Sequence, residues 1–122
     1  MDLLPAELRS AIKSTYPLGA QEGLGERAKV LVKFFFPAGR YTFYVTEGTS
    51  TFAAEDAPPG DDFLFFGYAL SPFGSDCDEW GYTTLSELSS VHHLGLSIER
   101  DLHLPFASRT VSELLASLSL SA

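Results

Sequence analysis

The sequence predicts an α+β fold, with an antiparallel sheet of four to five strands and helices packed on one face of it. Two observations lead to this prediction: short apolar segments are joined by hairpin-like turns, and segments of helical period stand at both ends of the chain. The 122 residues suit a single domain, residues 1–122, and 45% hydrophobic residues supply enough apolar side chain for one core.

The first half of the chain predicts a helix followed by a central hairpin. Residues 5–15 place apolar side chains at helical spacing behind Pro5, which suits the first turn of a helix. A glycine-bearing loop at 17–27 leads into residues 28–36, which are apolar on both faces and are therefore expected inside the sheet. Residues 41–48 alternate as the returning strand of the hairpin.

The second half predicts further strands. Residues 62–70 form a Phe-rich strand after the loop at 49–61, and residues 80–84 form a short strand after a second acidic turn. Residues 95–105 alternate as a last strand, interrupted near residues 99–101.

Two helices in this half have the same kind of start. Thr84 with Glu87, and Thr110 with Glu113, have the spacing of a capping box, in which a hydroxyl accepts from the third amide and a carboxylate bonds back. Apolar residues at helical spacing follow each pair, so each predicts the beginning of a helix.

Charge is distributed unevenly along the chain. The net charge is −8, and no Lys or Arg occurs between Tyr41 and Glu99. That stretch holds ten carboxylates, namely Glu47, Glu55, Asp56, Asp61, Asp62, Asp76, Asp78, Glu79, Glu87 and Glu99. The negative electrostatic field of these carboxylates repels nucleic acid and anionic membranes and attracts basic partners. Direct nucleic-acid binding is not expected, because it needs Lys or Arg contacts to phosphate.

Two acidic loops are the candidate partner-binding surface. They flank the strand at 62–70, so their acids are expected at its opposite ends, ~25 Å apart at ~3.3 Å per residue. One hypothesis is that these acids imitate the spaced phosphates of nucleic acid; the alternative is that they only keep a Phe-rich domain soluble. The candidate residues are Glu55, Asp56, Asp61, Asp62, Asp76, Asp78 and Glu79.

An enzyme is the alternative function. Asp101 and His103 share a face if their segment is a strand, and with Glu99 they could serve a small intracellular hydrolase once a nucleophile joins them in space. No nucleophile-elbow sequence is present. A pocket that collected Glu47, Tyr82, Glu99 and His103 would favour this alternative.

No metal or cofactor is expected. Asp76 and Asp78 alternate as calcium ligands do, but the glycine and distal glutamate of the twelve-residue calcium loop are missing. Cys77 with His92 and His93 lacks the spacing of a zinc site. The two histidines are instead expected to cap the carbonyls of the preceding helix.

The cellular compartment is predicted from the cysteine content, the first residues and the lengths of the apolar stretches. The single Cys77 allows no internal disulfide, which fits a reducing compartment. The first residues lack the pattern of a signal peptide, and no stretch reaches the ~20 apolar residues that span a bilayer. A cytoplasmic protein is expected.

A set of ordered segments resembles a known family. LLPAEL, QEGLGERAKVLVKFFFP, YTFYVTEG, DFLFFGY, GYTTLSEL and LGLSIERDLHL together resemble domain-of-unknown-function family 2958, over roughly residues 3–104. The resemblance implies no reaction, cofactor or catalytic residue. It implies a small bacterial protein of the kind often carried by plasmids, integrative elements and phages.

That setting suggests a function. Small acidic proteins on mobile elements often antagonise host defence, as anti-restriction or anti-CRISPR proteins do. The leading hypothesis is therefore a non-catalytic inhibitor whose partner is a protein with a basic nucleic-acid-binding surface. Besides the hydrolase, a structural or regulatory subunit remains an alternative.

Overall fold

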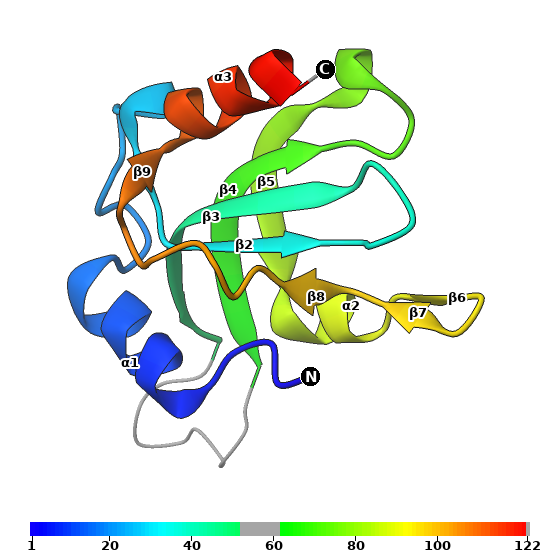
Figure 1. Cartoon of the computed structure of the whole chain (residues 1–122). Helices are drawn as coiled ribbons and strands as arrows, with labels where there is room; N and C mark the ends of the chain where they lie inside the picture. Colours follow the sequence, from blue (N-terminus) through cyan, green and yellow to red (C-terminus); the bar gives the residue numbers. More distant parts are fainter. Residues whose placement is uncertain (52–61, 122) are drawn as a thin grey trace.

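The computed structural model describes residues 1–51 and 62–121, and a five-stranded antiparallel sheet of order β5-β4-β3-β2-β8 lies at its centre (Figure 1). The strands are β2 (Val32–Phe35), β3 (Thr42–Ser50), β4 (Phe63–Leu70), β5 (Glu79–Thr84) and β8 (Glu99–Arg100). Three helices accompany it: α1 (Ala6–Thr15), α2 (Leu85–Ser89) and α3 (Val111–Ser121). The predicted α+β class and the size of the sheet are confirmed.

Two small strand pairs complete the described part of the chain. β1 (Lys29–Val30) pairs with β9 (Arg109–Thr110), and β6 (His92–His93) pairs with β7 (Leu96–Ser97). Two 3₁₀ turns lie at Gly25–Arg27 and Ser75–Cys77. No helix in the described ranges is long and apolar enough to cross a membrane.

The predicted hairpin at 28–48 is confirmed, with one difference. β2 and β3 pair from Val32 opposite Val45 to Phe35 opposite Thr42. The first strand, however, is broken at Leu31, so β1 pairs with β9 while β2 enters the main sheet. β3 lies in the middle of the sheet and is buried on both faces.

Helices cover both faces of the sheet, so the expectation that all of them pack on one face is not confirmed. Phe43 and Val45 of β3 belong to a core cluster that Leu8 and Ile12 of α1 and Leu85 and Leu88 of α2 contact. Tyr44, whose side chain alternates with these, belongs to a second cluster, together with Val111, Leu114 and Leu115 of α3. Figure 1 accordingly shows α1 and α2 below the sheet and α3 above it.

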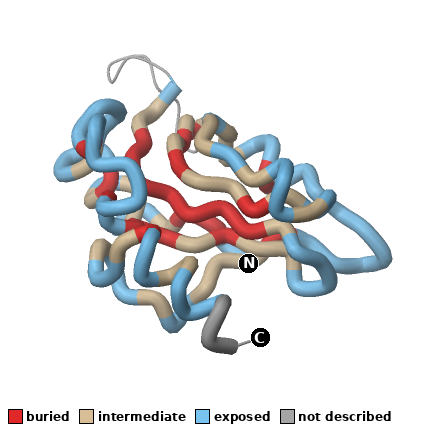
Figure 2. The backbone as a smooth tube through the Cα atoms, turned by 90° about the horizontal axis from the view of Figure 1, so that it is seen from above, coloured by how far each residue is buried: buried red, intermediate tan, exposed pale blue. Residues whose placement is uncertain are grey.

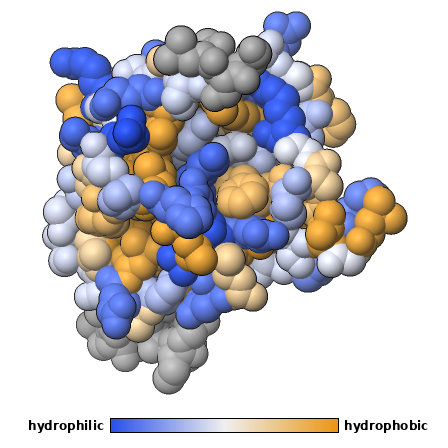
Figure 3. Space-filling model, viewed as in Figure 1, coloured by the Kyte–Doolittle hydropathy of each residue, from blue (hydrophilic) through white to orange (hydrophobic). Residues whose placement is uncertain are grey.

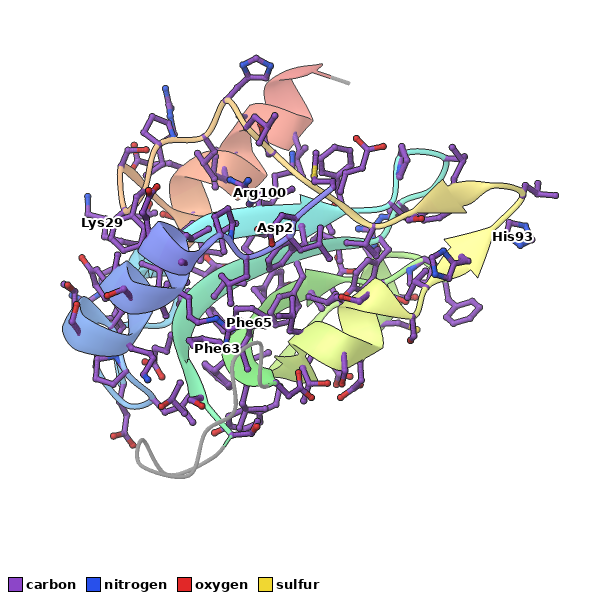
Figure 4. All side chains as sticks on the ribbon, turned by 90° about the horizontal axis from the view of Figure 1, so that it is seen from below. Asp2, Lys29, Phe63, Phe65, His93 and Arg100 are labelled. Carbon is purple, nitrogen blue, oxygen red and sulfur yellow. The ribbon has the colours of Figure 1, made fainter. Side chains whose placement is uncertain are left out.

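The face beneath α1 and α2 holds the main core. Phe34, Phe63 and Phe65 are each 0% exposed there, and the rings of Phe63 and Phe65 pack at a centroid distance of 5.2 Å. Figure 2 shows the buried residues running along the strands, and Figure 4 shows Phe63 and Phe65 in the space between α1 and α2. Fully burying each such ring stabilises the fold by about 1.5–3 kcal/mol.

Both predicted helix caps are present, although at Thr84 the Glu87 carboxylate bonds back to the hydroxyl rather than to the backbone amide. The Glu87 amide donates to Thr84 Oγ1 at 3.2 Å, and the Glu113 amide donates to Thr110 Oγ1 at the same distance. The Glu113 carboxylate accepts from the Thr110 amide at 3.0 Å, and this bond lowers the pKa of Glu113. Local hydrogen bonding thus fixes the starts of α2 and α3 where the sequence places them.

Two predictions for residues 92–105 were wrong. His92 and His93 do not cap α2; they form β6, and His92 Nδ1 lies 3.1 Å from Ser97 Oγ. Residues 95–105 are not one strand with a break near residues 99–101: Leu96–Ser97 is β7, Glu99–Arg100 is β8, which pairs with β2, and residues 101–105 form no strand. The β6–β7 hairpin projects from the body, and its tip carries hydrophobic surface (Figures 1 and 3).

A candidate binding cleft on the partly open face of the sheet

A cleft of about 670 Å³ lies on the face of the sheet that α3 only partly covers. The loop after α1 contributes Gly19, Gln21 and Glu22 to it. β4 and β5 contribute three aromatic residues, Phe66, Trp80 and Tyr82, and β3 contributes Glu47. The lining thus combines residues of an early loop with residues of three strands that follow later in the chain.

A β-bulge brings Glu47 into this cleft. Val45 pairs with Gly67 and Glu47 pairs with Phe66, so Thr46 is the extra residue of β3. Without the bulge, Glu47 would share a face with Val45, which is part of the Phe-rich core. The extra residue turns the carboxylate to the opposite face, and re-aiming a side chain in this way is a recognised use of bulges.

Backbone amides of the loop hold the Glu47 carboxylate. The side chain is 5% exposed; Oε1 accepts from the Gly19 amide at 2.7 Å and Oε2 accepts from the Gln21 amide at 2.8 Å. Gly19 has φ +94°, a conformation that glycine adopts without the strain a side chain would bring. A buried charge is therefore hydrogen-bonded at both oxygens, as burial of an ionised group requires.

Gln21 ties the same loop to two strands. Its Nε2 donates to the carbonyls of Lys29 and Thr46, each at 2.8 Å, and its Oε1 accepts from the Lys29 amide at 2.7 Å. The amide side chain thereby uses both donor hydrogens and an acceptor on the backbones of β1 and β3. The loop wall of the cleft is consequently fixed before any ligand arrives.

The aromatic wall consists of rings stacked along β4 and β5. Phe66 and Trp80 are stacked at a centroid distance of 5.8 Å with 16° between their planes, and Phe66 lies 4.9 Å from Tyr82. Tyr68 meets Trp80 edge-on at 5.2 Å and packs toward α3. Tyr82 is 65% exposed, so this end of the aromatic row faces solvent.

Two of the predicted partner-binding acids serve the fold itself. Asp78 accepts from Arg40 Nη1 at 2.6 Å and Nη2 at 2.8 Å and from the Ser71 amide, and the guanidinium holds the pKa of Asp78 below its usual value. Asp62 accepts from the amide and hydroxyl of Ser86, which ties α2 to β4. Burial would raise the pKa of Asp62, but these hydrogen bonds outweigh it and lower that pKa.

The other candidate acids have different placements. Asp76 and Glu79 are exposed on and beside the turn that joins β4 to β5. Glu55, Asp56 and Asp61 lie outside the described residues. Asp62 and the Asp76–Glu79 group stand at opposite ends of β4, as its bounds require, and none of these four acids lines the cleft.

The residues of the hydrolase hypothesis do not come together in the cleft. Glu47 and Tyr82 line it, whereas Glu99 and His103 do not. Asp101 Oδ1 accepts from the backbone amide of His103 at 2.8 Å, and its Oδ2 lies 4.0 Å from Lys33 Nζ. Within the described residues, no three His, Cys, Asp or Glu side chains gather as a metal site would need.

Comparison with known protein families identifies the family of the chain. A family model described as "Protein of unknown function (DUF2958)" matches residues 3–117. The chain belongs to the DUF2958 family. No curated protein and no solved structure gives a significant match to it. The match includes all the cleft residues of this DUF2958 protein, and it extends through most of α3, beyond the segments that carry the resemblance in the sequence.

Sequence reasoning did not find the aromatic wall or the role of Gln21. A signal for the wall was present: Phe66 and Tyr68 are two positions apart in one strand, and Trp80 and Tyr82 are two positions apart in the next, so each pair shares one face of its strand. Two aromatic rows on the face opposite the core predict an aromatic surface. Gln21 and the bulge at Thr46 gave no comparable signal, because their partners lie in distant segments.

Proposed function

We propose that this protein is a non-catalytic binding protein of a mobile element, which captures the basic nucleic-acid-binding surface of a host defence complex of restriction or CRISPR type. The observation that carries the proposal is the position of the stretch without Lys or Arg, which supplies β3, β4, β5 and α2. β5, β4 and β3 are neighbours in the sheet and α2 contacts β4 and β5, so these elements bring no Lys or Arg of their own to this side of the molecule, and its exposed acids attract a basic partner.

The exposed acids on this side indicate where a basic partner would dock. Asp76 and Glu79 are exposed, and β5 is an edge strand of the sheet, so a partner can approach them without displacing other elements. Asp62 and Asp78 act indirectly, because their carboxylates already hold Ser86 and Arg40. The proposal places the protein in the cytoplasm, where the exposed Cys77 stays reduced.

The test is capture of host proteins from a lysate by the immobilised chain, at low and at high salt, with duplex DNA as competitor. Captured proteins are expected to bind nucleic acid, and both salt and DNA should release them, since exposed charges are screened beyond ~8 Å near physiological salt. Retention that neither salt nor DNA changes would overturn the proposal.

A charge reversal with a matched control refines the test. Glu79→Lys should slow association with the captured protein more than it speeds dissociation, because a rim charge acts mainly on encounter. Glu7→Lys makes the same change in net charge at an exposed position of α1 and should leave the association rate nearly unchanged. The biological readout is the plating efficiency of a phage on a host that carries the captured system. Equal slowing by both variants would assign the effect to net charge alone.

A further inference from the structure

The cleft beside β5 combines aromatic rings with carboxylates in a way that the acidic loops do not. Phe66, Trp80 and Tyr82 offer ring faces and edges, while Glu22 and Glu47 bring negative charge to the same space. Among the described residues that line the cleft, none is Lys or Arg. An aromatic, anionic cleft in a protein of net charge −8 is suited to an organic cation.

We propose that this cleft binds the guanidinium group of an arginine side chain on a protein partner. The inference rests on the proposed function, which it deepens by naming the group of the basic partner that is recognised and the place that receives it. A guanidinium is planar and weakly hydrated, so it stacks on an aromatic ring while its N–H groups meet carboxylate oxygens. The volume of about 670 Å³ accommodates an extended arginine side chain.

Phe66 and Trp80, which are stacked on each other with 16° between their planes, both line the cleft and supply aromatic surface for the guanidinium. Tyr82 extends that surface toward solvent, where an incoming side chain first makes contact. Trp is the best aromatic partner for a cation, and a cation near its face is attracted by the charge distribution of the ring.

Two carboxylates line the same cleft as the rings and can accept from the N–H groups of an arginine head group. Each oxygen of Glu47 already accepts one backbone hydrogen bond and can accept another. Glu22 is exposed and adds a second charge on the loop side of the cleft. Because Gln21 and Glu47 hold the loop in place, little ordering remains to be done when the cation binds.

A nucleobase is the other planar group that aromatic platforms on sheets bind. Such platforms lie beside Lys and Arg residues that track the phosphates of the strand. Here two carboxylates occupy the cleft, and they would repel a phosphate backbone. The charge of the cleft therefore favours the guanidinium over single-stranded nucleic acid.

The experiment uses Trp80, the single tryptophan of the chain, as the reporter. The probe is N-acetyl-arginine amide, titrated at constant ionic strength, and the readouts are tryptophan fluorescence and the indole Nε1–H resonance of ¹⁵N-labelled protein. The control probe is N-acetyl-citrulline amide, which has nearly the same shape without the charge. A saturable change with arginine and none with citrulline is expected.

Variants locate the binding. Tyr82→Ala and Glu22→Gln should each weaken arginine binding about threefold, as expected for loss of one exposed cation–aromatic or charge contact. Phe73→Ala removes an aromatic side chain that is 88% exposed and outside the cleft, and it should bind like the parent. Far-UV circular dichroism checks that each variant is folded.

Three outcomes would overturn the inference: equal response to arginine and citrulline, no response to either probe, or a response to an oligothymidylate that exceeds the response to arginine. None of these outcomes contradicts the proposed function, because the capture of host proteins is measured in a separate experiment, through its dependence on salt. Loss of capture with arginine binding intact would conversely leave the cleft as a cation site and remove the proposed function.

Discussion

On one face of the sheet Phe63 and Phe65 are 0% exposed beneath α1 and α2, whereas on the other face Tyr82, on the neighbouring strand, is 65% exposed. Both faces are rich in aromatic residues, so composition does not distinguish them. The difference is coverage: α1 and α2 close the first face, while α3 packs near Tyr44 and Tyr68 and leaves the Phe66–Tyr82 end open. The same residue types therefore form a core on one face and an accessible surface on the other.

The largest expected effect is on the closed face. Phe34→Ala should lower the free energy of unfolding by about 3–5 kcal/mol, because it leaves a cavity among fully buried rings. Tyr82→Ala, the matched control on the open face, should change it by less than about 0.5 kcal/mol. Urea unfolding followed by far-UV circular dichroism measures both. Equal losses would show that the open face is also part of the core.

β3 and β4 approach each other closely at Gly67, next to the bulge at Thr46. A Cβ at this position would collide with the carbonyl of Tyr44, which is backbone and cannot rotate away. Gly67→Ala should therefore cost about 1–3 kcal/mol of stability. Gly81→Ala, at a position on β5 with open space around it, is the control and should be neutral or slightly stabilising. Thermal melting compares the two variants. A Gly67→Ala variant that melts like the parent would contradict the close approach of β3 and β4 at this position.

Glu47 connects the open face to its loop. Glu47→Gln replaces a charged acceptor with an amide whose NH₂ faces a backbone donor, so about 1.5–3 kcal/mol of stability should be lost. Hydrogen exchange at the Gly19 and Gln21 amides should become faster. Glu22→Gln, on the same loop but exposed, should leave both measurements unchanged. Unaltered exchange in Glu47→Gln would mean that the carboxylate does not order the loop.

A smaller effect concerns how α2 is held over the closed face, and it depends on pH. The folded pKa of Asp62 is below the ordinary value of 3.8, so its stabilising contribution is present above pH 3.8 and is lost as the pH falls below that value. Asp62→Asn should be less stable than the parent at neutral pH, and the melting temperatures of the two should converge in acid. Parallel melting curves across that range would contradict this assignment.

The sequence by itself determined the elements that local chemistry specifies. Thr84 with Glu87 and Thr110 with Glu113 start α2 and α3, and the alternation around Tyr44 set the two faces of β3. In these cases the interacting groups are near neighbours along the chain, so their spacing alone carries the information. The same holds for the acidic character of the stretch between Tyr41 and Glu99.

Only the tertiary structure decided which acidic side chains are free to meet a partner and where a cleft forms. Asp78 and Arg40 are 38 positions apart, and Asp62 reaches Ser86 across 24, so nothing in the local pattern separates these engaged acids from the exposed Asp76. The cleft likewise needs the Glu47 carboxylate to meet the amide of Gly19, 28 positions earlier in the chain. Such contacts depend on how the helices, bulge and loop pack together, and that packing is a property of the whole chain rather than of any one segment.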